Sequence, residues 1–193
     1  MLQEKLKQQT QKFHDRLESL MHVNAVMDKT LTFEQYKKNI FINFLAHDKL
    51  ENFLFGALSQ GLKEELHVNQ RRKLAALKQD IISLHLEEVE FNYDVELPHP
   101  VNDAYVLGAL YVLEGATLGG QVIAKQVQSS RLNDLVPFNY YHVYGSNVGA
   151  YWKSFVNVLN NLPEDDHKYA TAGAMMVFHM MISLAEKVNG TKL

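Results

Sequence analysis

The stretch Gly108-Ala-Leu-Tyr-Val-Leu-Glu-Gly-Ala-Thr-Leu-Gly-Gly-Gln-Val-Ile123 carries glycine at positions 108, 115, 119 and 120, in a segment whose other residues favour a helix. Each glycine inside a helix costs roughly 1 kcal/mol relative to alanine. Glycine also lacks a Cβ, so another helix or a large flat ligand can approach the backbone closely, and grouped glycines are one cause of helix kinks. The stretch therefore predicts a kinked helix that forms either a tight helix–helix crossing or one wall of a ligand site.

Apolar residues on both sides of this stretch recur at three- and four-residue steps, which is typical of amphipathic helices. Thr32-Phe-Glu-Gln35 has the form of a capping box that opens a helix, and we expect Gly61 to close that region. Asn102-Asp103 can cap the glycine-rich helix. Val89 to Leu97 is the nearest candidate for a strand, and Pro98-His-Pro100 predicts an extended connection. The pattern predicts one all-α domain over residues 1–193, a multi-helix bundle with helices near 2–21, 32–58, 69–87, 102–129, 147–161 and 163–188 and with the glycine-kinked helix among them.

The composition of the 193 residues limits the classes of function. A net charge of −3 argues against a nucleic-acid partner, which usually requires a basic excess. Cysteine is absent, so disulfides, thiolate catalysis and thiolate metal ligands are excluded. The charged N-terminus lacks the apolar core of a signal peptide, and no run of about 18 apolar residues indicates a membrane span. We expect a cytoplasmic protein.

Two further strings accompany the glycine-rich stretch. Thr10-Gln-Lys-Phe-His14-Asp-Arg-Leu-Glu18 places a histidine on a helix with a carboxylate one turn later, and Val148-Gly-Ala-Tyr-Trp-Lys-Ser-Phe155 follows near the C-terminus. In this order and at these spacings the three strings resemble the haem oxygenases. The sequence of the glycine-rich stretch is similar to that of the bacterial, biliverdin-producing branch of the family. The resemblance covers nearly the whole chain.

The resemblance implies that His14 is the proximal ligand of haem iron and that Glu18 orients its ring. A neutral imidazole suits this role, because a second ring nitrogen can donate to a carboxylate or water while the first binds the metal. Gly115, Gly119 and Gly120 match the glycines of the family's distal helix, which lies over the opposite face of the haem. Many members carry an aspartate after the first of these glycines, and this chain has Ala116 instead.

Four further residues match positions that contact haem in the resembling family. Lys7 and Lys153 correspond to basic residues that face the propionates. The alternative interpretation is that each lysine is an ordinary solvated charge on the surface. Tyr111 is a candidate phenolic partner, one residue away from the tyrosine of the family. Phe178 matches a phenylalanine of the closing helix. The methionines of that helix are read as adaptable core residues and not as axial ligands.

The implied reaction opens haem to biliverdin and releases carbon monoxide and ferrous iron, with haem as both substrate and cofactor. It consumes dioxygen and electrons from a donor such as a ferredoxin, a flavodoxin or a reductase. The main alternative is a protein that carries or senses haem without cleaving it, with Ala116 marking lost catalysis. A helical interaction module without a cofactor is a third possibility.

The same fold hosts di-iron oxidases and thiamin-degrading enzymes. Glu34, His47 and Glu51 have spacings from which a di-iron ligand set could project, but no second matching set is evident. The thiamin-degrading reaction would want a nucleophilic cysteine, which this chain lacks.

Overall fold

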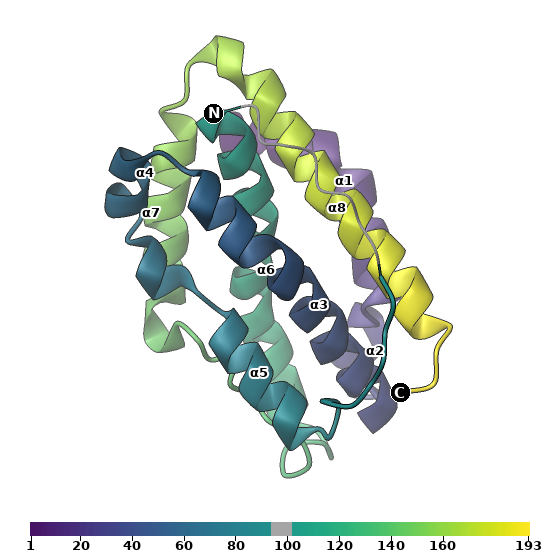
Figure 1. Ribbon diagram of the computed structural model, residues 1–193. Coiled ribbons are helices and arrows are strands. Elements are labelled where there is room, and N and C mark those ends of the chain that lie inside the picture. The colour runs from purple at the N-terminus through teal and green to yellow at the C-terminus, as the bar shows by residue number, and fades with distance from the viewer. Residues whose placement is uncertain (94–101) are drawn as a thin grey trace.

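The computed structural model describes residues 1–93 and 102–193, and within these ranges every regular element is a helix. The chain forms a bundle of long helices, with the shorter ones at its edges (Figure 1). The α-helices are α1 (Leu2–Leu20), α2 (Val23–Met27), α3 (Phe33–Ala57), α4 (Gln60–Glu65), α5 (Leu74–Ser83), α6 (Asp103–Gln128), α7 (Val148–Asn160) and α8 (His167–Asn189). Three short 3-10 turns, η1 (Val68–Arg71), η2 (Gly145–Asn147) and η3 (Glu164–Asp166), precede α5, α7 and α8. The predicted all-α class is confirmed.

Side-chain caps begin two of the long helices where the sequence predicts them. Thr32 Oγ1 accepts from the Gln35 amide at 3.2 Å while the Gln35 side chain accepts from the Thr32 amide at 2.9 Å, which completes the capping box of α3. At the start of α6 the Asn102 side chain accepts from the Tyr105 amide at 3.0 Å. These bonds satisfy amides that a helix N-terminus otherwise leaves without partners.

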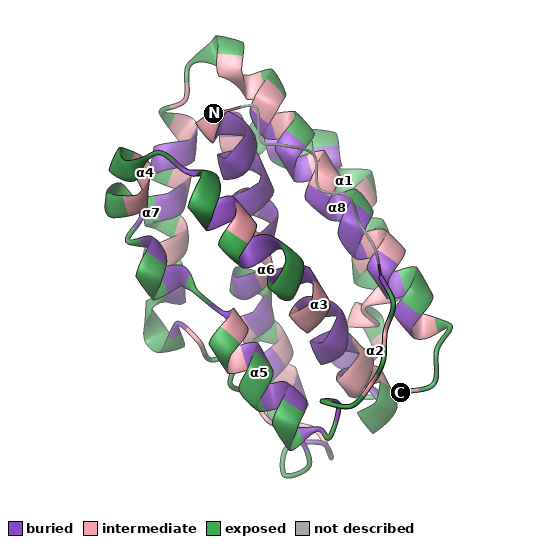
Figure 2. Ribbon diagram, in the orientation of Figure 1, coloured by how far each residue is buried: buried purple, intermediate pink, exposed green. Residues whose placement is uncertain are grey.

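Helix α6 lies within the bundle and packs chiefly against α8, which in turn packs against α1. Figure 2 shows buried positions along much of α6 and α3, with exposed positions concentrated on the outer helices and turns. By length and composition alone α6 could cross a membrane, but 56% of its most apolar window is buried inside the bundle. The apolar character of α6 is therefore accounted for by packing against its neighbours.

Small residues set the contact between α6 and α8. A Cβ at Gly108 would overlap the main chain of Ala170, and a Cβ at Gly173 would overlap the carbonyl of Tyr105. The tight helix–helix crossing that the glycine-rich stretch allows is therefore real, and it is made at Gly108. The α-helix is continuous through all four glycines of this stretch, and the kink stays a prediction.

The structure corrects three details of the predicted elements. Gly61 does not close α3, because the helix ends at Ala57 and Gly61 lies inside α4. The helix expected over 69–87 is shorter, because the chain first forms the turn η1 and α5 begins only at Leu74. Residues 89–93 form no strand; the rest of that candidate and Pro98-His-Pro100 lie outside the described residues.

Candidate functional site

A cleft of about 370 Å³ lies between α1 and α6. Residues from α3, α7, α8 and the 129–147 connection close its inner side, including Asn39, Tyr141, Trp152 and Met181. Most of the lining is apolar, and its polar atoms are concentrated on α1 and α3. Such a cavity, apolar with a few polar groups, is the usual form of a small-molecule or cofactor site.

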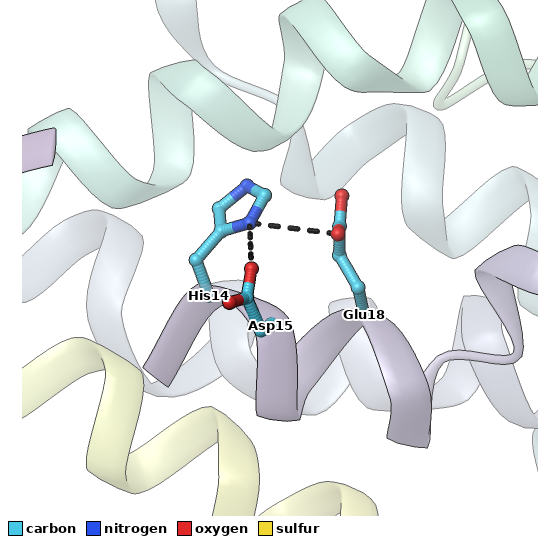
Figure 3. Close-up of side chains that lie close together, drawn as sticks. All are labelled: His14, Asp15 and Glu18. Atoms are coloured by element: carbon cyan, nitrogen blue, oxygen red, sulfur yellow. Dashed lines mark ion pairs between the residues drawn. The ribbon is translucent and has the colours of Figure 1, made fainter. Parts of the chain in front are cut away.

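His14 stands on the α1 wall of this cleft. Its imidazole remains 52% exposed, and its Nδ1 lies 3.6 Å from Glu18 Oε2 and 4.0 Å from Asp15 Oδ1. Figure 3 shows that His14 and Glu18 project on the same side of α1, with the imidazole directed away from the helix. The distance to Glu18 is longer than a hydrogen bond but short enough for a water or a small rotation to join the two groups. Among the described residues, these three side chains form the one group of histidines and acids close enough together to share a metal ion.

The middle of the α6 wall faces the cleft with three small residues, Gly115, Ala116 and Gly119, between larger apolar side chains of the same helix. A Cβ at Gly119 would meet nothing within 4 Å among the described residues, and one at Gly115 would meet only the Trp152 ring at 3.8 Å. Bare backbone at these two positions therefore lets a ligand lie close to the helix. Gly120 differs, since it is buried outside the cleft lining and a Cβ there would stand 2.9 Å from the Tyr141 ring.

Three of the other four predicted contact residues also line the cleft, namely Lys7, Tyr111 and Phe178. The Phe178 ring packs edge-on to His14 with centroids 6.3 Å apart, and Tyr111 packs against Trp152 at 5.7 Å. Lys153 is exposed on α7 and does not line the cleft. The structure thus brings together seven of the nine predicted site residues and leaves Gly120 and Lys153 outside.

Reasoning from the sequence missed a polar part of the lining. Asn39, Asn43 and Tyr140 line the cleft and are each at most 5% exposed. The Tyr140 hydroxyl donates to Asn43 Oδ1 at 3.1 Å, and burial together with nearby acidic and phenolic groups raises the pKa of Tyr140. The available signal was the recurrence of polar residues every four positions along one face of α3, at 39, 43, 47 and 51.

His47 and Glu51, the two members of that row considered as di-iron ligands, are engaged in other bonds. His47 Nδ1 lies 3.2 Å from Glu51 Oε2, which also accepts from the amides of Lys73 and Leu74 at 2.7 and 3.0 Å. Burial lowers the pKa of His47, which favours the neutral ring. Glu34 lies exposed in the first turn of α3, beside Lys37. In the described residues no third carboxylate or histidine joins His47 and Glu51, so the geometry does not support a di-iron centre.

A buried ion cluster holds the middle of α6. Glu114 accepts from Arg71 Nη1 at 2.7 Å, from Lys73 Nζ at 2.6 Å and from the Tyr144 hydroxyl at 2.9 Å. Burial alone would raise the pKa of Glu114, but the charges of Lys73 and Arg71 and the hydrogen bonds outweigh it and lower that pKa. Because Glu114 directly precedes Gly115, this cluster fixes the position of the wall that faces His14.

The family model for heme oxygenase matches residues 1–187, nearly the whole chain. The chain belongs to the haem oxygenase family. No protein among the curated sequences matches it significantly.

Two solved haem oxygenases share the fold of this family member. The enzyme of Neisseria meningitidis, solved with NO and CO bound, has a TM-score of 0.77 at 23% identity and covers 100% of this chain and 94% of its own. Haem oxygenase-1 of the cyanobacterium Synechocystis, solved in complex with haem, has a TM-score of 0.65 at 16% identity. The match covers 98% of this chain and 92% of the cyanobacterial chain. At these identities the likeness supports the fold, and membership of the haem oxygenase family supports haem degradation in general.

Proposed function

We propose that this chain binds haem in the cleft between α1 and α6 and cleaves it oxidatively to biliverdin, releasing carbon monoxide and ferrous iron. The observation that carries the proposal is the pairing of an accessible histidine with a bare glycine backbone across one cleft. His14 stands on α1, and Gly115 and Gly119 lie on α6. An imidazole on one wall and bare backbone at two glycines of the other suit a flat substrate whose metal is ligated from one side.

The described residues fit haem in charge and in chemistry. His14 supplies the imidazole ligand, and Glu18, 3.6 Å from its Nδ1, holds the ring orientation directly or through water. Lys7 is the one cation among the described residues that line the cleft, so it is the proposed partner of a propionate. Phe178 and Trp152 offer apolar surface for the macrocycle.

When bound, haem supplies an iron that can bind and reduce dioxygen. The protein's own contribution is to orient the bound haem and to exclude water from the cleft. Gly115 and Gly119 place no side chain on the α6 wall at these two positions, so a ligand can lie against the helix backbone there. The mostly apolar lining keeps most water out of the cleft.

We propose dioxygen as the second substrate and a ferredoxin, a flavodoxin or a reductase as the electron donor, in the cytoplasm. These partners are proposed from the family membership and from the reaction, which requires electrons from outside the protein. Gly120 and Lys153 match family positions of the distal wall and of a propionate contact, but both lie outside the cleft lining, so the proposal assigns neither of them to haem.

The test is to add haemin to the purified protein, supply ascorbate or a reductase in air, and follow the absorbance spectrum. We expect a one-to-one complex with a Soret band that decays into the broad red band of a bilin. Carbon monoxide released during the decay, trapped by deoxymyoglobin, and iron captured by ferrozine identify the other two products. A Soret complex that persists under reduction in air would contradict the enzymatic proposal.

A haem carrier or sensor is the second candidate, and one observation favours it. Ala116 lines the cleft where many members have an aspartate, and Glu18 is the one carboxylate among the described lining residues. The same experiment separates the two candidates. A carrier or sensor binds haemin in the same proportion and keeps it intact, whereas a protein without a cofactor shows no Soret band.

A further inference from the structure

Asn39 has an acceptor oxygen without a hydrogen-bond donor among the described residues. Its side chain is 1% exposed and lines the inner end of the cleft. The amide orientation is determined by its other atom, because Asn39 Nδ2 donates to the Met21 carbonyl at 2.7 Å. A flipped amide would place two oxygens together at that distance, so Oδ1 must point away from Met21.

The other members of the α3 polar row differ from Asn39. Asn43 donates to the Asn39 carbonyl at 2.8 Å and accepts from Tyr140 at 3.1 Å. His47 and Glu51 are joined to each other, and Glu51 also accepts two main-chain amides. These bonds engage the acceptors of the row farther from Met21. Within this row, Asn39 Oδ1 is the side-chain acceptor that has no donor among the described residues. The two other buried polar atoms without a partner there, His167 Nδ1 and Asn189 Oδ1, belong to residues outside the cleft lining.

Asn39, on α3, is bonded to one end of α1, and this place limits what can donate to its Oδ1. Lys7, His14 and Met21 follow one another at seven-residue spacing, so about 10 Å of helix separates each from the next. Asn39 is bonded at the Met21 end, and the cleft's cation is at the Lys7 end. A propionate, itself an acceptor, would be repelled by Asn39 Oδ1 and attracted by Lys7. The edge of a macrocycle near Asn39 offers only C–H groups, so a strong donor there must be a small molecule.

We infer that Asn39 Oδ1 holds a water molecule at the inner end of the cleft, and that this water is the local proton source for the reaction proposed above, on which the inference rests. Asn39 is thus a positioning residue that acts through its water. A buried acceptor without a donor is costly, and a bound water removes that cost. Ala116 on the α6 wall offers no side-chain acceptor, so in this inference the ordered water is held by Asn39 of α3 at the inner end of the cleft.

The test compares Asn39→Leu with Asn189→Leu. Asn189 is a matched control, because its Nδ2 likewise donates to a carbonyl at the end of α1, that of Leu20 at 2.9 Å, and its buried Oδ1 likewise has no donor among the described residues. Unlike Asn39, it lies outside the cleft lining. Both variants lose one such bond, so a merely structural effect appears in both. The readout is the pH midpoint of the visible spectrum of the ferric haemin complex, which reports proton loss from water on the open face of the iron.

If Asn39 Oδ1 is hydrogen-bonded, through the water that it holds, to the water on the open face of the iron, it stabilises that second water over hydroxide. Removal of the Asn39 acceptor then lowers the pH midpoint at which this water loses its proton. We expect Asn39→Leu to lower it by about half a unit to one unit and Asn189→Leu to leave it unchanged. The ionisable groups that face the cleft are the same in all three proteins, namely Lys7, His14, Glu18, Tyr111, Tyr140 and Tyr141. Equal midpoints in wild type and Asn39→Leu, or equal shifts in the two variants, would overturn the inference.

A second measurement needs neither the variant nor haem. A crystal structure of the wild-type protein, at a resolution that shows buried waters elsewhere, should contain a water within hydrogen-bonding distance of Asn39 Oδ1. Absence of that water overturns the inference even if haem is cleaved normally. Conversely, a protein that fails to bind haemin but shows this water contradicts the proposed function and leaves the assignment of Asn39 as a water-holding residue supported.

Discussion

Gly108 of α6 lies directly against the main chain of Ala170 on α8, and a Cβ at Gly108 would overlap the Ala170 carbonyl oxygen. Eleven residues later, Gly119 faces open space in the cleft. The same residue type therefore serves two purposes on one helix. At Gly108 it allows two helices to touch, and at Gly119 it leaves room for something that is not protein.

This difference predicts opposite effects of alanine on stability. Gly108→Ala should lower the free energy of unfolding by about 3 kcal/mol or more, because the new methyl group can enter only by separating α6 from α8. Gly119→Ala should leave it unchanged or raise it by up to about 1 kcal/mol through helix propensity. Urea denaturation of the two apoproteins measures both. Similar losses in the two variants would contradict the division of the glycines.

A large side chain at Gly119 should act on the ligand and not on the fold. Gly119→Leu projects into the cleft from α6, so we expect an apoprotein of near wild-type stability with slower turnover or a changed ratio of biliverdin isomers. Chromatography of the bilin products, together with the rate of Soret decay, measures the effect. An unchanged isomer and rate would show that α6 does not border the reacting part of haem.

Replacement of His14 by alanine tests the proposed iron ligand. His14 is exposed and packs on Phe178 only at its edge, so the apoprotein should fold normally. The haemin complex should lose the wild-type spectrum, and turnover should fall by more than the roughly 10- to 100-fold that follows loss of a residue supporting a metal ligand. His179→Ala is the control, because His179 is exposed on α8 outside the cleft lining. A wild-type spectrum and rate in His14→Ala would exclude the ligand assignment.

The two lysines predicted to face propionates should differ. Lys7 lines the cleft and Lys153 does not. An exposed ion pair is worth about 0.2–1 kcal/mol, so Lys7→Ala should weaken haemin binding up to about fivefold, with a smaller loss at high salt. Lys153→Ala should bind like wild type. The dissociation constants come from fluorescence quenching of Trp152, and an equal loss in both variants would restore Lys153 to the site.

Stability should fall as the pH drops from 7 to 5, with His47 contributing. Burial lowers the pKa of His47 in the folded chain below its usual value of 6.5. Below pH 6.5 the His47 ring therefore binds a proton in the unfolded chain but not in the folded chain. The contribution of His47 to stability is thus fully present above pH 6.5 and is lost as the pH falls below it. The slope for one proton is at most about 1.4 kcal/mol per pH unit. His47→Gln should flatten the dependence measured by urea denaturation, and an equal slope would contradict a neutral His47.

Much of this site could be predicted because its signals are local. Each of these signals depends on residues within one or two turns of one another. They are the apolar residues that recur along α1, the His14–Glu18 spacing, and the caps at Thr32 and Asn102. Signals that arise between distant segments were missed. Gln70-Arg-Arg-Lys73 has the composition of a solvated basic run, yet Arg71 and Lys73 are buried because Glu114, more than 40 residues later, meets them.

The glycines show the same limit. Gly108 and Gly119 are indistinguishable in the sequence, and only the presence or absence of a partner separates them. Asn39 was missed for a related reason, since a polar residue on an apolar helix has no assigned direction until Met21 fixes its amide. The Lys153 and Gly120 assignments came from matching strings, which report order along the chain and not distance from the cleft.

The Glu114 cluster also has a consequence for engineering. The glycine-rich half of α6 is short of intrinsic helix propensity, and its position depends on a salt-bridged clamp whose cations come from the segment before α5 and whose phenol comes from the turn before α7. A designer who grafted this helix alone into another scaffold would transplant the groove-forming glycines without their anchorage. The transferable unit is the helix together with residues 66–73 and Tyr144.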